Sequence, residues 1–200
     1  MAGSPLRATV LRAAVDYIAA HGPDGLSFRQ VAAAAGVSHQ APYHHFTDRK
    51  GIFEAIALEG FSMFTDALQG AADSDTDDPA VAMLDGYVTF ALEHRGYFRV
   101  MFRPDLNGLS ESPALLETAD GAFDVLVRLV EQILGPDAAV ADVRARATAM
   151  WALAHGLAVL LIDGPLEVKL GPVADRAALV RAVADQSGLA GPARRARPRR

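Results

Sequence analysis

Signals that start and stop helices recur along this chain, and they constrain its fold more than any other sequence feature. Glycine-proline pairs, which end one helix and separate it from the next, stand at Gly22-Pro23, Gly135-Pro136, Gly164-Pro165 and Gly171-Pro172. No segment alternates apolar and polar residues over a useful length, as a half-buried strand would. We therefore predict an all-α fold.

Polar residues that can cap a helix precede four apolar segments in the N-terminal part, at Ser4, Ser27, Ser38 and Asp48. The first predicted helix begins at Pro5. Ser27 and Gln30 match a capping box, in which each side chain satisfies a free backbone amide of the other. The helix after Ser27 is short and ends near Gly36. We predict an N-terminal domain over residues 1–60, with three helices braced by the fourth.

The rest of the chain carries the same helix signals. An acidic break, Asp73–Pro79, follows the fourth helix. Further helices are expected at about 79–94, 97–103, 113–134, 138–163 and 173–187. The expected separators are Gly96, the Pro104–Ser112 loop and the glycine-proline pairs. We predict a second, helical domain over residues 61–190 and a disordered, arginine-rich tail over 191–200.

Composition limits the possible classes of protein. The chain has no cysteine, which excludes disulfides, thiolate metal sites and a cysteine nucleophile and fits a cytoplasmic location. Charged residues interrupt the apolar N-terminus, so no signal peptide is expected. The most apolar stretch, Ala147–Ile162, contains His155 and is shorter than the roughly 18 residues of a membrane span. We interpret it as a buried helix and expect no membrane partner.

The net charge of −5 is unusual for a DNA-binding protein, but the distribution of charge matters more than its total. Acidic residues concentrate in the middle of the chain, and residues 1–60 hold as many basic as acidic side chains. Adjacent His44 and His45 would point about 100° apart on a helix, which argues against a shared metal ion. We predict no metal site and no cofactor.

The stretch from Ser27 to Phe53 indicates a helix-turn-helix. Two short helices are joined by Ala35-Gly36-Val37, in which Gly36 tolerates the positive φ that a tight turn needs. The second helix, about Ser38–His44, is expected to enter the major groove of DNA. Phosphate contacts would then fix its register, and a few side chains near its start would read base edges.

This stretch resembles the DNA-binding domain of tetracycline-repressor-like (TetR/AcrR) regulators. Their pattern runs from Ala-Gly-Val-Ser to Tyr-x-x-Phe and then to a basic residue three positions later. The chain has Ala35–Ser38, Tyr43, Phe46 and Arg49 in these places. A second resemblance, carried by Met150–Gly156, is to the Trp-His-Gly motif in the regulatory domain of one TetR subgroup.

The resemblance implies a regulator, most typically a repressor, that binds a palindromic double-stranded DNA operator as a homodimer. The DNA contacts it implies are Arg29, Ser38, His39, Gln40, Tyr43, His44 and Arg49. Tyr43 and Arg49 would bind phosphates. Gln40 suits adenine and Arg29 suits guanine. Two positions depart from the family pattern, because Ala41 lacks the usual hydroxyl and Arg49 replaces the usual lysine.

The resemblance also implies a small hydrophobic or amphipathic effector, bound among aromatic and methionine side chains of the second domain. The candidate ligand contacts are Phe64, Tyr87, Phe90, Phe98, Met101, Phe102, Phe123, Trp151 and His155. An effector that favours another spacing of the two recognition helices would lower DNA affinity, with the helix after Asp48 as the link.

The last two long predicted helices supply the expected dimer interface. Their apolar candidates are Val140, Val143, Trp151, Ile162, Leu179, Val180 and Val183.

Two other classes are compatible with the residues alone. One is an enzyme or small-molecule-binding protein without DNA function. The chain contains no P-loop and no Gly-x-Gly-x-x-Gly, His-Glu-x-x-His or Gly-x-Ser-x-Gly motif, so we expect no enzyme. The other is an activator or a nucleoid-type DNA binder, which the sequence does not separate from a repressor.

Overall fold

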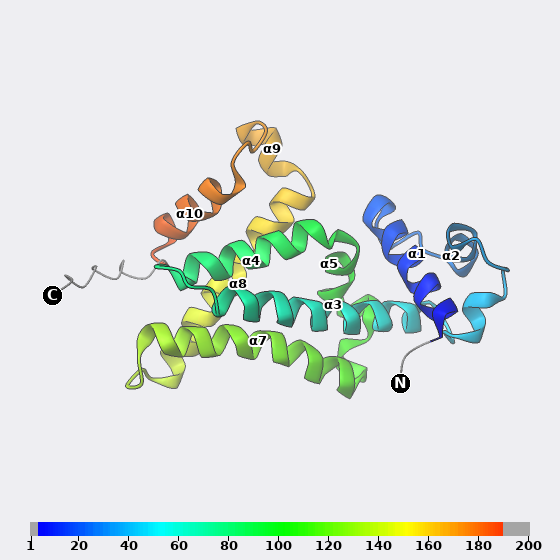
Figure 1. Cartoon of the computed structure of the whole chain (residues 1–200), viewed down its shortest axis with the longest axis horizontal. Coiled ribbons are helices and arrows are strands. Elements are labelled where there is room, and N and C mark those ends of the chain that lie inside the picture. The colour runs from blue at the N-terminus through cyan, green and yellow to red at the C-terminus, as the bar shows by residue number, and fades with distance from the viewer. Residues whose placement is uncertain (1–3, 190–200) are drawn as a thin grey trace. The chain divides into compact units, whose positions relative to one another are not determined.

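The chain is all-α, as predicted. The computed structural model describes residues 4–189, and within this range it contains helices and no strand (Figure 1). In chain order the elements are α1 (Pro5–His21), α2 (Phe28–Ala35), the 3₁₀ helix η1 (Ala41–His44), α3 (Arg49–Ala72), α4 (Pro79–Glu93), α5 (Arg95–Met101), α6 (Pro104–Asn107), the 3₁₀ helix η2 (Leu109–Glu111), α7 (Pro113–Leu134), α8 (Val140–Ile162), α9 (Pro165–Leu170) and α10 (Arg176–Ser187). The basic tail predicted over 191–200 lies outside the described residues.

The helices form two compact units. The first unit combines the residues up to Met63 with His94–Asp120, and the second combines Phe64–Glu93 with the residues from Gly121 onward. In the first unit, α1 packs against α2 and α5. In the second unit, α4 packs against α8 and α10. Helices α5 and α6 therefore belong with the N-terminal helices, although α4 separates them in sequence. The predicted division at residue 60 stays a prediction.

Most predicted helix ends in the first unit are confirmed. α1 spans Pro5–His21 and ends at Gly22, although the Ser4 side chain forms no capping hydrogen bond. The backbone amide of Gln30 donates to Ser27 Oγ at 3.3 Å, and the Ser27 hydroxyl donates to Gln30 Oε1 at 2.6 Å. Only one half of the capping box thus forms as expected. Gly36 ends α2 in the left-handed region with φ 65°.

The predicted second helix of the helix-turn-helix is wrong in its extent. A helix was expected over Ser38–His44, capped by Ser38, but only the 3₁₀ helix Ala41–His44 forms, and its first flanking residue is Gln40. The physical reason is Pro42, which has no backbone N–H to donate to Ser38. The amide of Ala41 donates to the Ser38 carbonyl instead, at 2.9 Å, which is the tighter 3₁₀ pattern.

In the rest of the chain, two expected loops contain short helices. α6 and η2 lie in the predicted Pro104–Ser112 loop, and α9 lies between the two glycine-proline pairs near residues 164–172. Both α6 and α9 begin with proline, whose fixed φ suits the first position of a helix. In both segments proline begins a helix, whereas it was expected to separate helices.

Helix α8 is buried on one face only, whereas the sequence predicted a buried helix. Its buried residues are Val143, Ala147, Met150, Ala154, Leu157, Ala158 and Ile162. Trp151 is 40% exposed and Leu160 is 43% exposed. Among the described helices, α8 alone is long and apolar enough to cross a membrane, and one such helix is weak evidence for a membrane protein.

Gly96 was expected to separate two helices, but it lies inside α5. At Gly96, α5 packs directly against α1. A Cβ atom at this position would lie 2.3 Å from the carbonyl oxygen of Val15. No side chain fits at that distance, because the obstacle is backbone that cannot rotate away. The absence of a side chain at Gly96 therefore permits the α1–α5 contact.

We expect Gly96→Ala to lower the free energy of unfolding by about 1–3 kcal/mol, because α5 must move away from α1. Gly70→Ala is the matched control. Gly70 also lies within a helix, but nothing lies within 4 Å of its added Cβ, so alanine should stabilise by about 0.5–1 kcal/mol. Thermal unfolding of both variants tests this expectation. Equal effects of the two substitutions would contradict the proposed close contact.

Candidate DNA-binding surface and effector site

Helix η1 presents its polar side chains to solvent because its other face is buried. Ala41 and Pro42 are buried, and Phe46 directly beyond η1 is 5% exposed. Six of the seven predicted DNA contacts are exposed: Arg29, Ser38, His39, Gln40, Tyr43 and His44. They come from the start of α2, from the segment leading into η1 and from η1 itself, the parts expected to face DNA. The exposed surface formed by these six residues is called the η1 surface below.

The ring of Tyr43 contacts aromatic neighbours at the η1 surface. Tyr43 is 56% exposed, and its ring forms an edge-to-face pair with the ring of Phe28, with centroids 4.5 Å apart. The ring of His39 lies 6.1 Å away on the solvent side of the turn. An aromatic residue of the core would be buried, so the exposure of Tyr43 favours a contact outside the chain.

Arg49, the seventh predicted DNA contact, is half-buried and has partners within the chain. Its Nη2 donates to the carbonyl oxygen of Pro23 at 3.1 Å, and its guanidinium carbon lies 5.0 Å from the centre of the Phe53 ring. Arg49 thereby ties the start of α3 to the loop between α1 and α2. This contact with Pro23 was not anticipated, since the two residues are far apart in sequence.

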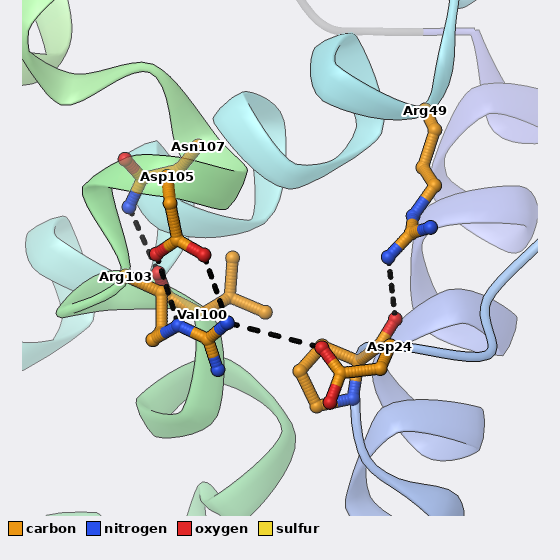
Figure 2. A network of polar contacts seen from close by, with 7 residues as sticks. Asp24, Arg49, Val100, Arg103, Asp105 and Asn107 are labelled. Carbon is orange, nitrogen blue, oxygen red and sulfur yellow. Dashed lines mark hydrogen bonds and ion pairs between the residues drawn. The ribbon is translucent and has the colours of Figure 1, made fainter.

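A second arginine, Arg103 in the turn between α5 and α6, contacts the same loop. Figure 2 shows Arg49 and Arg103 on either side of Asp24. Arg103 Nη2 lies 3.8 Å from Asp24 Oδ1, and Arg103 also makes two hydrogen bonds to Asp105, of 2.9 and 2.8 Å. The hydrogen bonds from Arg103 hold the pKa of Asp105 below its usual value. The α1–α2 loop is thus contacted both from the start of α3 and from the turn between α5 and α6.

Arg99 extends this attachment to the end of α1. Its Nη1 donates to the carbonyl oxygens of Ile18 and Ala19, both at 3.4 Å. A cation is favourable at this position, because the carbonyls at the end of a helix carry partial negative charge. The contacts of Arg49, Arg99 and Arg103 are called the arginine clamp below.

Asn107 shapes the turn that carries Arg103. It is the one fully buried polar residue in the described chain. Its amide nitrogen donates to the carbonyls of Val100 and Met101, at 2.8 and 3.0 Å, and its oxygen accepts from the amide of Leu109 at 2.9 Å. Sequence reasoning missed both Asn107 and the arginine clamp. Their partners depend on how the helices pack, and the only local signal was an Asn-Gly pair.

The predicted ligand contacts fall into two aromatic clusters, one in each unit. In the first unit, the Phe102 ring packs edge-on against Phe98 and Phe61, with centroids 5.2 and 5.4 Å apart. Met101 is fully buried in the same unit, and its sulfur would lie 2.8 Å from a Cβ at Gly60. This cluster joins α3 to α5.

The second cluster contains the polar groups among the predicted ligand contacts. In the second unit, Tyr87 of α4 packs edge-on against Phe64, with centroids 4.8 Å apart. Tyr87 Oη lies 3.0 Å from His155 Nδ1. Phe90 also packs against Phe64, at 4.9 Å. The rings of Phe123 and Trp151 form a further pair, with centroids 5.7 Å apart.

Burial keeps both polar groups of this second cluster neutral at pH 7. Burial raises the pKa of Tyr87 far above its ordinary value, and a hydrogen bond with Trp151 partly offsets this rise. Burial also lowers the pKa of His155. Within residues 4–189, no three His, Asp or Glu side chains are grouped as metal ligands would be.

These observations define a class of protein: an all-helical chain with an exposed helix-turn-helix and a second helical unit built around aromatic side chains. The family described as "Bacterial regulatory proteins, tetR family" matches residues 10–56. The family described as "Tetracyclin repressor-like, C-terminal domain" matches residues 80–186. The chain belongs to the tetR family, and it is a ligand-responsive transcriptional regulator.

Solved structures agree with this assignment. A protein of unknown function from Rhodococcus sp. RHA1 is 31% identical, with 93% of this chain and 95% of that chain covered and a TM-score of 0.73. A tetR-family regulatory protein from Rhodococcus RHA1 is 23% identical (94% and 98% covered, TM-score 0.68). The fatty acid degradation regulator FadR from Bacillus halodurans is 16% identical (94% and 96% covered, TM-score 0.72). The last two show a shared fold. A comparison with curated proteins finds no match.

The lowered pKa of His155 predicts a specific loss of stability in acid. The unfolded chain binds this proton more readily than the folded chain does. The stability gained by keeping His155 neutral is therefore present above its ordinary pKa of 6.5 and is lost as pH falls through the lower, folded value. Tyr87 stays protonated throughout this range. We expect His155→Gln to lose less stability than wild type between about pH 7 and pH 5. Parallel unfolding curves for the two proteins over this range would contradict the expectation.

Proposed function

We propose that this regulator is a repressor that binds a palindromic operator as a homodimer and leaves it when a hydrophobic or amphipathic effector binds. The observation that carries the proposal is the η1 surface, where six predicted DNA contacts are exposed over a buried apolar support. The proposal includes a cytoplasmic location, no enzymatic activity and membership of the Trp-His-Gly subgroup.

Each side chain of the η1 surface suits a part of the DNA. Exposed Tyr43 reaches a phosphate through its hydroxyl, and Gln40 offers the amide pair that suits adenine. Arg29 suits guanine. His39 and His44 reach base edges or phosphates beside them, and Ser38 reaches a phosphate. Arg49 binds a phosphate near the start of α3 while it remains beside Pro23.

The exposed face of α8 supports the proposed homodimer. Small or apolar residues recur on it at helical spacing, namely Ala141, Ala145, Thr148, Ala152, Gly156 and Leu160, and all are exposed. Gly156 costs about 1 kcal/mol relative to alanine in a helix. Nothing in residues 4–189 lies within 4 Å of a Cβ placed there, so no contact among these residues requires glycine. Close approach by the same helix of a second copy supplies a reason for it.

Three of the apolar residues first assigned to this interface belong elsewhere. Val143, Ile162 and Val180 are buried within the chain, at 5%, 9% and 0% exposure. The interface proposed here therefore rests on the exposed face of α8, together with α10, which follows α8 in sequence after the short α9.

In the proposed response, the effector binds one of two arrangements of the dimer more tightly than the other. An effector lowers operator affinity only by the factor with which it prefers the non-binding arrangement. α3 begins beside the η1 surface and continues into the second unit. The arginine clamp adds a second attachment, through α5, to the end of α1 and the loop after it.

DNA binding is tested in shift assays with the DNA upstream of the protein's own gene. We expect Tyr43→Phe and Arg49→Ala to weaken binding to all sequences, and Arg49→Ala to reduce the salt slope by about one unit. Gln40→Ala should relax specificity at one base position per half-site, by about 1–3 kcal/mol. Lys169→Ala removes an exposed cation of α9 and is the control. Wild-type binding by the η1-surface variants would refute the placement of the recognition helix.

The dimer is tested by sedimentation at micromolar concentration. Wild type should sediment as about twice the 21.1 kDa chain, since the exposed face of α8 is self-complementary. Gly156→Leu should shift the protein toward monomer without disturbing its fold, because the new side chain meets nothing in its own chain. Gly70→Leu, at a comparably open helical glycine of α3, should remain dimeric. A wild-type protein that sediments only as monomer would count decisively against the proposal.

A further inference from the structure

Arg7, in the first turn of α1, lies over the ring of Phe46. Its guanidinium carbon is 5.2 Å from the centre of that ring, a distance at which a cation is attracted to an aromatic face. Phe46 follows η1 and its capping residue, and its backbone amide donates to the carbonyl oxygen of Pro42 at 2.9 Å. α1 also packs against η1. A side chain from the first helix therefore lies beside the end of η1.

The contact with Phe46 places Arg7 next to the segment that joins two proposed DNA contacts. Phe46 stands three residues after Tyr43 and three residues before Arg49. Tyr43 is exposed on the η1 surface, and Arg49 begins α3. Both are proposed to bind phosphates of the DNA backbone. Arg7 is only half-buried, so it can reach solvent at the edge of the same surface.

The charge of Arg7 has no counterpart among residues 4–189. Within this range its guanidinium makes no hydrogen bond and no ion pair, and its one contact is with the ring of Phe46. The neighbouring cations differ, because Arg49 donates to the carbonyl oxygen of Pro23 and Lys50 pairs with Glu111. An aromatic ring accepts no conventional hydrogen bond, so the N–H groups of Arg7 remain available to another partner.

The stability of α1 does not explain a cation at this position. The first turn of a helix carries partial positive charge, which disfavours an arginine there. A methionine or leucine at position 7 would cover the Phe46 ring without bringing a charge. Packing therefore accounts for a long side chain at this position but not for its guanidinium.

We propose that Arg7 is a further DNA contact, which binds a phosphate of the operator backbone. This inference rests on the DNA binding proposed above and adds a residue to it. The N–H groups of a guanidinium match two oxygens of one phosphate. The ring of Phe46 restricts the guanidinium before DNA arrives, so the side chain loses less freedom when it binds.

A phosphate suits the position of Arg7 better than a base edge does. The side chains proposed to read bases, Gln40 and Arg29, precede η1 and lie in α2. Arg7 instead contacts the residue between η1 and the proposed phosphate contact Arg49. Phosphate contacts carry no sequence information. We therefore expect Arg7 to strengthen binding to every DNA sequence by the same factor.

The test removes the charge and keeps the packing. Arg7→Met and Arg7→Gln are neutral and have unbranched side chains of similar length, whereas Arg7→Lys keeps the charge. Shift assays from about 50 to 200 mM salt compare the DNA upstream of the protein's own gene with an unrelated duplex. We expect both neutral variants to reduce the salt slope by about one unit per bound protomer, and Arg7→Lys to retain it. Affinity for both duplexes should fall equally, by about three- to tenfold per protomer at 0.1 M salt.

Arg12→Met is the matched control, because Arg12 is an exposed cation of the same helix. It lies five residues after Arg7, about 140° around the helix. Its charge acts on Tyr97 of α5. The affinity and salt slope of Arg12→Met should equal those of wild type. Thermal unfolding of all the variants shows whether each keeps its fold.

A second measurement locates the phosphate. The upstream duplex is prepared with a single neutral methylphosphonate linkage, at one position after another. Wild type should lose affinity at the linkage that Arg7 contacts in each half-site. The neutral Arg7 variants should bind this modified duplex as well as the unmodified one, and they should remain sensitive at the phosphates bound by Tyr43 and Arg49.

Two results would overturn the inference: an unchanged salt slope in the folded neutral variants, which would mean that Arg7 only covers Phe46, or a changed preference for the upstream DNA over the unrelated duplex, which would indicate a base contact. Either result leaves the proposed repressor function standing, because Tyr43→Phe and Gln40→Ala test it separately. A wild-type protein that binds no DNA would overturn the proposed function and this inference together.

Discussion

The direct contact between the backbones of α1 and α5 is the constraint on which the first unit depends. Gly96 places α5 so close to α1 that a Cβ would lie 2.3 Å from the Val15 carbonyl oxygen. At this distance Arg99 reaches the last carbonyls of α1, and Arg103 reaches Asp24 in the following loop. Without the close contact, neither arginine would meet its partner. The position of α1 beneath the DNA-binding helices therefore depends on a helix that follows much later in the chain.

The arginine clamp lies where it can position the α1–α2 loop, but its contacts are weak. Arg103 and Asp24 are largely exposed, and exposed ion pairs contribute about 0–1 kcal/mol each. Contacts of this size bias the position of the α1–α2 loop without locking it. A regulator needs a loop that is positioned without being fixed, because an effector can shift an equilibrium only by the difference in its affinity for the two states. Buried Asn107 gives the turn behind Arg103 a defined shape through its hydrogen bonds to Val100 and Met101.

Helix α8 serves two purposes on its two faces. Its inward face packs on α4 and brings His155 to Tyr87. Its outward face carries small residues and a helical glycine, Gly156, that no contact within the chain explains. Under the proposed function, one helix would carry both part of the predicted effector cluster and a dimer contact. A change at the Tyr87–His155 contact would then reach the second subunit without passing through any loop.

The sequence by itself determined the helical class, most helix ends and the η1 surface, because caps, glycines and apolar spacing act over a few residues. Pro42 shows the limit of such signals: it shortened the predicted recognition helix, although its missing N–H was visible in the sequence. Only the tertiary structure decided that Arg49 contacts Pro23 and that Gly96 lies inside a helix rather than between two. It also decided that Tyr87 meets His155. These contacts join residues that are distant in sequence, and they exist only once helices have packed, which local propensity does not encode.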